Sequence, residues 1–344
     1  MPVFAPKYLE QLGTRIFTGC GTPAADAWLV AKALVDANLM GLESHGVIRI
    51  RQYVSYVEQG QIVPGAAITV VKETSATAIV DCGKNFGQVG AFKALEIAIR
   101  KARENSISCV VTRHCNHVGR LGAYPQKAAE QDMICLLTAN GDFGGHFVAP
   151  WGGKKGRLAT NPLAYDAPTK GYPVLADIAT SVLSEGKIRV LLHENQPLPD
   201  NAVLDADGKV TRNPGRFYGP PMGAILPFGG EVGYKGFALS LLVEILSGTL
   251  AGNAITDETV FGNGLCFIVI NPAAFIDMEN FKLLMEELTA YMKSTPLAEG
   301  FDEILLPGER DFRKMEQTTE GGITLDDRTW EQIVETARGL GVAI

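Results

Sequence analysis

The chain has 344 residues, of which 46% are hydrophobic and 20% are charged, and its formal net charge is −7. Length and composition are typical of a globular protein with one large or two medium domains. The acidic balance and the lack of a basic run argue against a nucleic-acid or membrane partner. We find no signal peptide and no apolar run near the roughly 20 residues of a membrane span, so we expect a cytoplasmic protein. Its six cysteines, which lack zinc-type spacing, should be reduced, and we expect no metal site.

The first part of the chain is predicted to be helical. Apolar residues recur at helical spacing over 24–40, with Thr22 as N-cap and Pro23 as first helical residue. A second helical pattern covers 47–58. The segment between them, 41–46, is therefore a helix-to-helix corner, and Ser44 is a candidate cap for the second helix.

From about residue 67 the pattern alternates between strands and helices, which indicates an α/β layer structure. Strands are predicted at 68–71, 78–81, 107–112, 133–138, 174–179 and 264–271, and helices at 90–103, 124–131 and 236–250. Residues 141–162 are a glycine-rich loop region, and 195–222 is rich in turns. Helices return at 278–293 and 329–340. We therefore predict a helical subdomain built from both chain ends (1–70 and 276–344) and an α/β domain (71–275).

Three clusters of polar residues could carry chemistry. In the first, Ser44-His45-Gly46-Val47-Ile48-Arg49, a helix that begins at Ser44 would place His45 and Arg49 on one face. An imidazole that transfers protons and a guanidinium that binds carboxylates suit chemistry on a 2-hydroxy or 2-oxo acid. The alternative is a capped corner with an ordinary surface histidine and arginine.

The second cluster, residues 116–124, lies in a strand-to-helix loop, where active sites often form. His117 is its candidate acid or base, and a glycine-rich turn is the alternative. The third, residues 229–236, brings Lys235 and several glycines to a helix start, which favours anion binding; the alternative is a structural loop with a solvated lysine. Neither a Gly-x-Gly-x-x-Gly nor a Walker pattern is present. Two further polar sets, 160–162 and 177–181, read singly as turns and caps.

In this order, the clusters resemble the non-Rossmann malate/L-lactate dehydrogenase family, which includes ureidoglycolate dehydrogenase, 2,3-diketo-L-gulonate reductase and sulfolactate dehydrogenase. The resemblance rests on the segments 44–49, 116–119, 150–153, 160–162, 177–181, 234–236 and 306–309. It implies an α/β, non-Rossmann NAD(P)-binding fold with a layered mixed sheet, and a homodimeric oxidoreductase acting on a small 2-hydroxy or 2-oxo acid.

The resemblance also implies roles for individual residues. His45 and His117 match proposed proton donors, and Ser44 and Asp177 join them in the catalytic group. Arg49 and Thr160 would bind the substrate, and Arg120, which stands where relatives often have a small residue, could hold a second carboxylate. The cofactor would be NAD or NADP, bound by His117, Val118, Gly119, Arg120, Leu121, Asn140, Asp177, Ile178, Ala179, Thr180, Tyr234, Lys235, Gly308, Glu309 and Arg310.

Two rival functions remain at this point. One is a non-catalytic oligomeric ligand-binding protein on the same scaffold, which would need a broken constellation of polar groups. The other is a Ser/His hydrolase that uses Ser44 and His45. That hydrolase lacks a Gly-x-Ser-x-Gly elbow, and we do not expect adjacent residues to point at each other.

Overall fold

The computed structural model describes residues 1–253, 255–258 and 261–344. Its centre is a seven-stranded mixed sheet in the order β2-β3-β4-β10-β5-β6-β7. β3 and β4 are parallel, and the other neighbouring pairs are antiparallel. The strands are β2 (Thr69–Glu73), β3 (Thr77–Asp81), β4 (Ile107–Arg113), β5 (Ile134–Ala139), β6 (Leu163–Asp166), β7 (Ala176–Ile178) and β10 (Leu265–Ile270).

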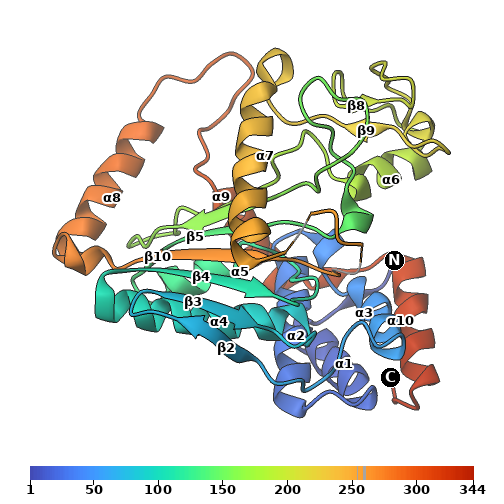
Figure 1. Cartoon of the computed structure of the whole chain (residues 1–344), viewed down its shortest axis with the longest axis horizontal. Coiled ribbons are helices and arrows are strands. Elements are labelled where there is room, and N and C mark those ends of the chain that lie inside the picture. Colours follow the sequence, from blue (N-terminus) through green and yellow to red (C-terminus); the bar gives the residue numbers. More distant parts are fainter. Residues whose placement is uncertain (254, 259–260) are drawn as a thin grey trace.

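Helices cover both faces of this sheet (Figure 1). α4 (Gly87–Asn105) and α5 (Ala123–Ala129) pack on one face, and α7 (Tyr234–Ser247) packs on the other. Successive side chains of a strand point to opposite faces. Accordingly Val110 of β4 lies in the core beneath α4, and Val111 lies in the smaller cluster beneath α7. The predicted α/β fold with a layered mixed sheet is confirmed.

The two ends of the chain meet in a helical region. α1 (Pro6–Gly19), α2 (Ala24–Leu39), α3 (Arg49–Glu58) and α10 (Asp327–Gly339) share one apolar core. β1 (Val3–Phe4) pairs with β11 (Ile323–Thr324), and both termini lie on this side of the molecule (Figure 1). α8 (Met278–Lys293) stands apart on the opposite side and buries none of its residues. The domain boundaries at 70 and 276 stay a prediction.

Most predicted elements are present within a few residues of their expected bounds, and α8 matches its prediction at both ends. The cap at Thr22 is wrong, because α2 begins at Ala24 and Pro23 is its N-cap. Four elements were not predicted from the sequence: α1, the sheet strand β6, α6 (Glu185–His193) and α9 (Glu309–Gly321). The small ribbon of β8 (Val203–Leu204) and β9 (Ala224–Ile225) was not predicted either.

One stretch of the described chain, Tyr234–Ala251, is long and apolar enough to span a membrane by length and composition, which the sequence analysis did not expect. The same test is passed by core helices of soluble proteins, so this finding alone is weak evidence for a membrane span. The stretch contains α7, which packs on the sheet through one side. Leu241, Leu242 and Ile245 remain exposed on it.

Candidate active site

The two predicted histidines lie face to face. His45 ends the 3₁₀ turn Glu43–His45, and His117 lies in the loop between β4 and α5. Their rings are stacked, with centroids 5.7 Å apart. Burial, together with the nearby charge of Arg49, lowers the pKa of His45 to about 4 and that of His117 well below its usual value. Both imidazoles are therefore neutral at neutral pH and available as proton acceptors or hydrogen-bond donors.

Arg49 lies beside this pair as the first residue of α3. Its Nε donates to the Ser44 carbonyl oxygen (2.7 Å), and its Nη1 donates to Gln52 Oε1 (2.6 Å). Nη2 makes no hydrogen bond within the part of the chain that is described. A cation in the first turn of a helix is opposed by the helix dipole, whereas an anion there is stabilised. The position therefore suits an anionic ligand bound between the guanidinium and the helix N-terminus.

The helix predicted over 47–58 is present as α3, but it begins at Arg49, so the cap expected at Ser44 is wrong and His45 does not share a helix with Arg49. Ser44 caps no helix, since the 3₁₀ turn ends at His45 and α3 starts only at Arg49. A tertiary contact explains the break, because the backbone N–H of Val47 donates to Oδ1 of the buried Asn38. Gly46 is required there, since a Cβ on it would lie 2.0 Å from the same oxygen.

A second expectation about this corner is also wrong. Although they are adjacent, Ser44 and His45 do point at each other, with Ser44 Oγ 2.9 Å from His45 Nδ1.

Asp177 and Arg120 form a second group near Gly122, where the His117 loop meets α5. Asp177, in β7, accepts a hydrogen bond from the backbone N–H of Gly122 (2.7 Å), so it anchors the start of α5. Burial raises the pKa of Asp177. Arg120 is only 6% exposed, and its Nη2 donates to Gln126 Oε1. Both side chains therefore make hydrogen bonds within the protein itself. Direct contact of Arg120 with a substrate stays a prediction.

A third group is organised by Glu244, which the sequence analysis did not single out. This buried carboxylate of α7 accepts hydrogen bonds from Asn140 Nδ2 (2.8 Å) and Asn161 Nδ2 (3.0 Å). Thr180 Oγ1 in turn donates to the carbonyl oxygens of Thr160 and Asn161. The predicted residues Asn140, Thr160 and Thr180 are thus brought together. One acidic residue in an otherwise apolar helix was the available signal for this group.

Five of the other predicted residues lie at two helix starts. Tyr234 and Lys235 open α7 and are exposed, as expected for a lysine at a helix start; within the described residues Lys235 has no ion pair. Gly308 has φ +85° and precedes α9, and a Cβ there would lie 2.8 Å from the Leu175 carbonyl oxygen. Gly308 therefore lies against Leu175, the residue that precedes β7.

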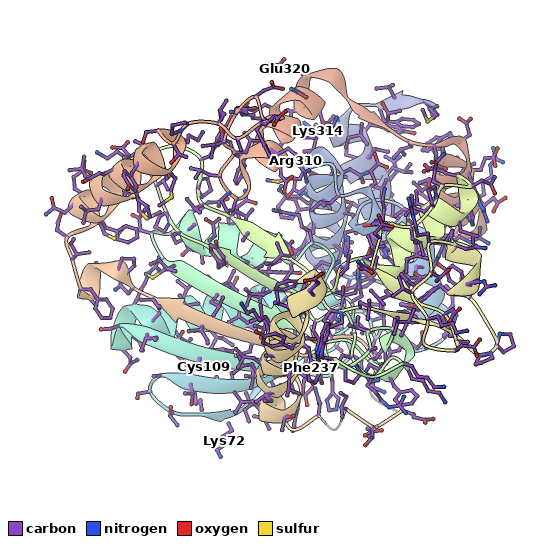
Figure 2. All side chains as sticks on the ribbon, turned by 90° about the horizontal axis from the view of Figure 1, so that it is seen from above. Lys72, Cys109, Phe237, Arg310, Lys314 and Glu320 are labelled. Carbon is purple, nitrogen blue, oxygen red and sulfur yellow. The ribbon has the colours of Figure 1, made fainter. Side chains whose placement is uncertain are left out.

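Glu309 and Arg310, the first two residues of α9, differ in exposure. The carboxylate of Glu309 pairs with Lys293 and Arg313, whereas Arg310 is exposed beside Lys314 on the same helix (Figure 2). Glu309 also lines a hollow of about 280 Å³ between α8 and residues 169–173. No other predicted site residue is among the residues that line this hollow.

The His117 loop is pressed against α4, and this contact makes a testable prediction. A Cβ on Gly87 would lie 2.2 Å from the His117 carbonyl oxygen and 2.3 Å from that of Asn116. Because both atoms belong to the backbone, the loop must move to admit it. We expect Gly87→Ala to lower the free energy of unfolding by about 1–3 kcal/mol, measured by urea denaturation. Gly339→Ala, with no atom within 4 Å of the added Cβ, is the control, and an equal loss in both variants would contradict the contact.

Comparison with known proteins supports a dehydrogenase. A family model described as malate/L-lactate dehydrogenase matches residues 4–334. The chain is 37% identical to a malate dehydrogenase of Pyrococcus abyssi, covering 95% of this chain and 92% of that protein. It is also 37% identical to an L-sulfolactate dehydrogenase of Methanocaldococcus jannaschii, covering 99% and 98%.

Solved structures agree with this result. The structure of sulfolactate dehydrogenase from Methanocaldococcus jannaschii matches with a TM-score of 0.89 and 36% identity, over 99% of this chain and 98% of that chain. A named dehydrogenase of this kind requires a nicotinamide cofactor, and the comparisons favour neither the hydrolase nor the binding protein. The chain therefore belongs to the malate/L-lactate dehydrogenase family and is a 2-hydroxyacid dehydrogenase.

Proposed function

We propose that the protein transfers a hydride between NAD or NADP and a small 2-hydroxy or 2-oxo acid of the malate and lactate type. The observation that carries this proposal is the stacked pair of neutral imidazoles beside the Arg49 guanidinium. Arg49 would bind the substrate carboxylate through its free Nη2 end. When bound, the nicotinamide supplies or accepts the hydride at the carbon that bears the oxygen.

Within this proposal the histidines handle the proton. In the oxidation direction a neutral imidazole accepts the hydroxyl proton of the substrate, and in reduction it returns the proton to the forming alkoxide. Burial and, to a smaller extent, the positive charge of Arg49 lower the pKa of both imidazoles in the free protein, and a bound carboxylate would offset the charge of Arg49. Substrate binding would thereby raise the pKa of the histidines toward the range in which proton return is efficient.

The residues proposed for the cofactor suit an anionic dinucleotide. Lys235 stands in the first turn of α7 without an ion pair among the described residues, so its charge and the helix N-terminus are free for a phosphate. Asn140, the segment 177–180, the loop 117–121 and residues 308–310 complete the proposed lining. Fluorescence titration with NADH and with NADPH separates the two cofactors, and saturation by neither would contradict the assignment.

The proposed activity is tested with a substrate panel. Pyruvate, oxaloacetate and 3-sulfopyruvate are the 2-oxo acids that correspond to the substrates in the names of relatives. Each is incubated with NADH or NADPH, and oxidation is followed at 340 nm. We expect turnover of at least one acid. If none reacts while calorimetry still records binding of an acid and a cofactor, the proposal fails in favour of a binding protein.

We also propose that the active unit is a homodimer, located in the cytoplasm. Most of the apolar face of α2 is used within the chain, because Leu34 is buried in the core with α1 and Leu29 packs against that core, while Trp28 of the same helix is 46% exposed. The faces of α7 and α8 remain uncovered. Leu284 and Leu288 of α8 are 54% and 48% exposed, and Leu241, Leu242 and Ile245 of α7 are similarly open. We infer that a second copy, rather than a lipid bilayer, covers both helices.

The dimer makes a further prediction. A leucine buried at an interface contributes about 1.5–3 kcal/mol, so Leu288→Asp should raise the dimer dissociation constant more than tenfold. Light scattering combined with activity across a dilution series measures this effect. Val210→Asp, at another exposed apolar residue, is the matched control. A fully active monomer at every dilution of the unaltered protein would overturn the proposal, and recovery only in a membrane fraction would overturn the cytoplasmic location.

A further inference from the structure

Residues 262–264, which precede β10, contact both the His117 loop and the end of β5. Asn263 faces the loop. Its backbone N–H donates to the carbonyl oxygen of Cys115 (2.8 Å), and its Oδ1 accepts a hydrogen bond from the backbone N–H of Val118 (3.2 Å). Cys115 and Val118 stand on either side of His117 in the chain, so these two contacts hold the backbone of the loop around that histidine.

The same asparagine also holds the end of β5. Its Nδ2 donates to the carbonyl oxygen of Asn140, the residue that follows β5 (2.6 Å). The backbone N–H of Gly264 donates to Oδ1 of Asn140 (2.8 Å), and the carboxylate of Glu244 accepts from its Nδ2 (2.8 Å). Asn140 is therefore held through its carbonyl oxygen and both ends of its side chain. We call the two side-chain hydrogen bonds of Asn263, to Val118 and to Asn140, the Asn263 clamp.

The orientation of the Asn263 amide follows from these two partners. A backbone N–H can only donate, and a backbone carbonyl oxygen can only accept. The amide therefore turns its oxygen toward Val118 and its nitrogen toward Asn140, because the reverse orientation would place two donors together and two acceptors together. The neighbouring backbone is equally close to the loop. A Cβ on Gly262, whose φ is +93°, would lie 2.3 Å from the Cys115 carbonyl oxygen.

The clamp bears on the reaction because two transfers must occur at adjacent atoms of the acid. The hydride moves to or from the carbon that bears the oxygen, and the proton moves to or from that oxygen. Both transfers need reacting atoms about 3–3.5 Å apart, and a misplacement of about 1 Å can lower the rate about 10²-fold. The ring of His117 is stacked on that of His45, and its Nδ1 lies 2.7 Å from the hydroxyl oxygen of Tyr53. These contacts hold the ring, whereas Asn263 holds the backbone that carries it.

We propose that Asn263 is a positioning residue for hydride and proton transfer. Through the clamp it fixes the His117 loop, and with it the stacked histidine pair, at one distance from Asn140 in the proposed cofactor lining. In this view Asn263 touches neither substrate nor cofactor and acts through the two segments that it joins. The clamp stands on the geometry alone, whereas its effect on turnover rests on the proposed function.

Two substitutions separate the two contacts of the clamp. Asn263→Asp keeps an oxygen for the Val118 N–H but, ionised at pH 8, sets a second oxygen against the Asn140 carbonyl. Asn263→Leu has a similar branched shape and loses both contacts. Hydrogen exchange of the Val118 N–H in the ligand-free protein, followed by mass spectrometry at single-residue resolution, measures the first contact. We expect about fivefold faster exchange in Asn263→Leu, the value of one typical hydrogen bond, and an unchanged rate in Asn263→Asp. An unchanged rate in Asn263→Leu would overturn the clamp.

Kinetics test the effect of the clamp on turnover. Turnover is counted per cofactor site titrated by NADH or NADPH fluorescence, so a loss of folded protein does not lower it. We expect kcat to fall about ten- to a hundredfold in both variants, with little change in KM for the acid because Arg49 lies on α3. The cofactor Kd should also change little, because Lys235 lies on α7. If Asn263→Leu does not fold, Asn263→Asp still tests the link to Asn140.

Asn271→Leu is the matched control. Asn271 directly follows β10 at its other end, and its Oδ1 accepts from the backbone N–H of Ala273 in the next turn (3.1 Å), so its kcat should not change. Unchanged kcat in Asn263→Asp, or a KM that rises as much as kcat falls, would overturn the positioning role. If the unaltered protein reduces no acid, the proposed function fails together with the effect on turnover, while hydrogen exchange still decides whether Asn263 holds the loop.

Discussion

Replacing His117 with glutamine is expected to lower kcat by about 10²–10⁴-fold, the usual cost of removing a general acid or base. Glutamine has a similar length and retains a donor, but it cannot take up and release a proton at neutral pH. The matched variant is His45→Gln, whose ring stacks on His117 from the 3₁₀ turn. We expect it to lose less activity, because His45 is hydrogen-bonded only to the hydroxyl of the exposed Ser44, whereas His117 is hydrogen-bonded to the buried Tyr53 and is therefore held more firmly.

Turnover of each variant on the acid found in the panel measures this difference. Unchanged kcat in both variants would show that neither imidazole transfers the proton. A larger loss in His45→Gln would reverse the assignment of the two histidines.

The pH dependence of the activity is a second test of the roles of His45 and His117. Oxidation needs the neutral imidazole, so activity falls when a lower pH protonates it. Because burial lowers the pKa of His45 to about 4 and that of His117 well below its usual value, the acidic limb of kcat/KM should lie below pH 6.5. A limb centred at pH 6.5, where an unperturbed histidine titrates, would contradict the buried pair.

Replacing Arg49 with lysine is expected to raise KM for the acid by roughly ten- to a hundredfold, the value of one hydrogen bond to a charged group. Lysine keeps the positive charge but loses the planar fork that binds a carboxylate through two parallel hydrogen bonds. It also cannot reproduce the two donations that hold the guanidinium in place, from Nε to the Ser44 carbonyl and from Nη1 to Gln52.

Arg51→Lys is the control for this prediction. It lies on the same helix, is exposed, and contacts Glu335 at 3.6 Å, so its KM should not change. Cofactor binding, measured by fluorescence titration, should be unaffected in both variants. A cofactor Kd that rises as much as KM in Arg49→Lys would assign Arg49 to the nucleotide instead.

The local patterns of this sequence were sufficient for most of its secondary structure. α8 has both of its predicted ends, because its apolar spacing is a local feature of the sequence; the structure adds that the Asp277 side chain caps it. The buried strand β4 was equally clear from its apolar residues. α1 was missed although Pro6 opens it and Leu9, Leu12, Ile16 and Phe17 are spaced for a helix. The signal for α1 is therefore local to the sequence.

The residues of the motifs could also be identified from the sequence. His45, Arg49, His117 and Lys235 were singled out by residue type and position, and the family of the chain followed from the order of the motifs. How these residues act on a substrate stays a proposal, because residue type defines what a side chain can do and not what it faces.

Only the tertiary structure decided the geometry of the site. The cap expected at Ser44 does not form, because Oδ1 of Asn38 in α2 accepts the backbone N–H of Val47 and α3 begins only at Arg49. Tyr53 and Gln88 lie on different helices, and the sequence has no pattern that joins them to His117. Helical and strand periodicity report contacts between residues a few positions apart. The partners that hold a histidine ring, break a helix or anchor a loop come from distant segments, and only packing of the core brings them within hydrogen-bond distance.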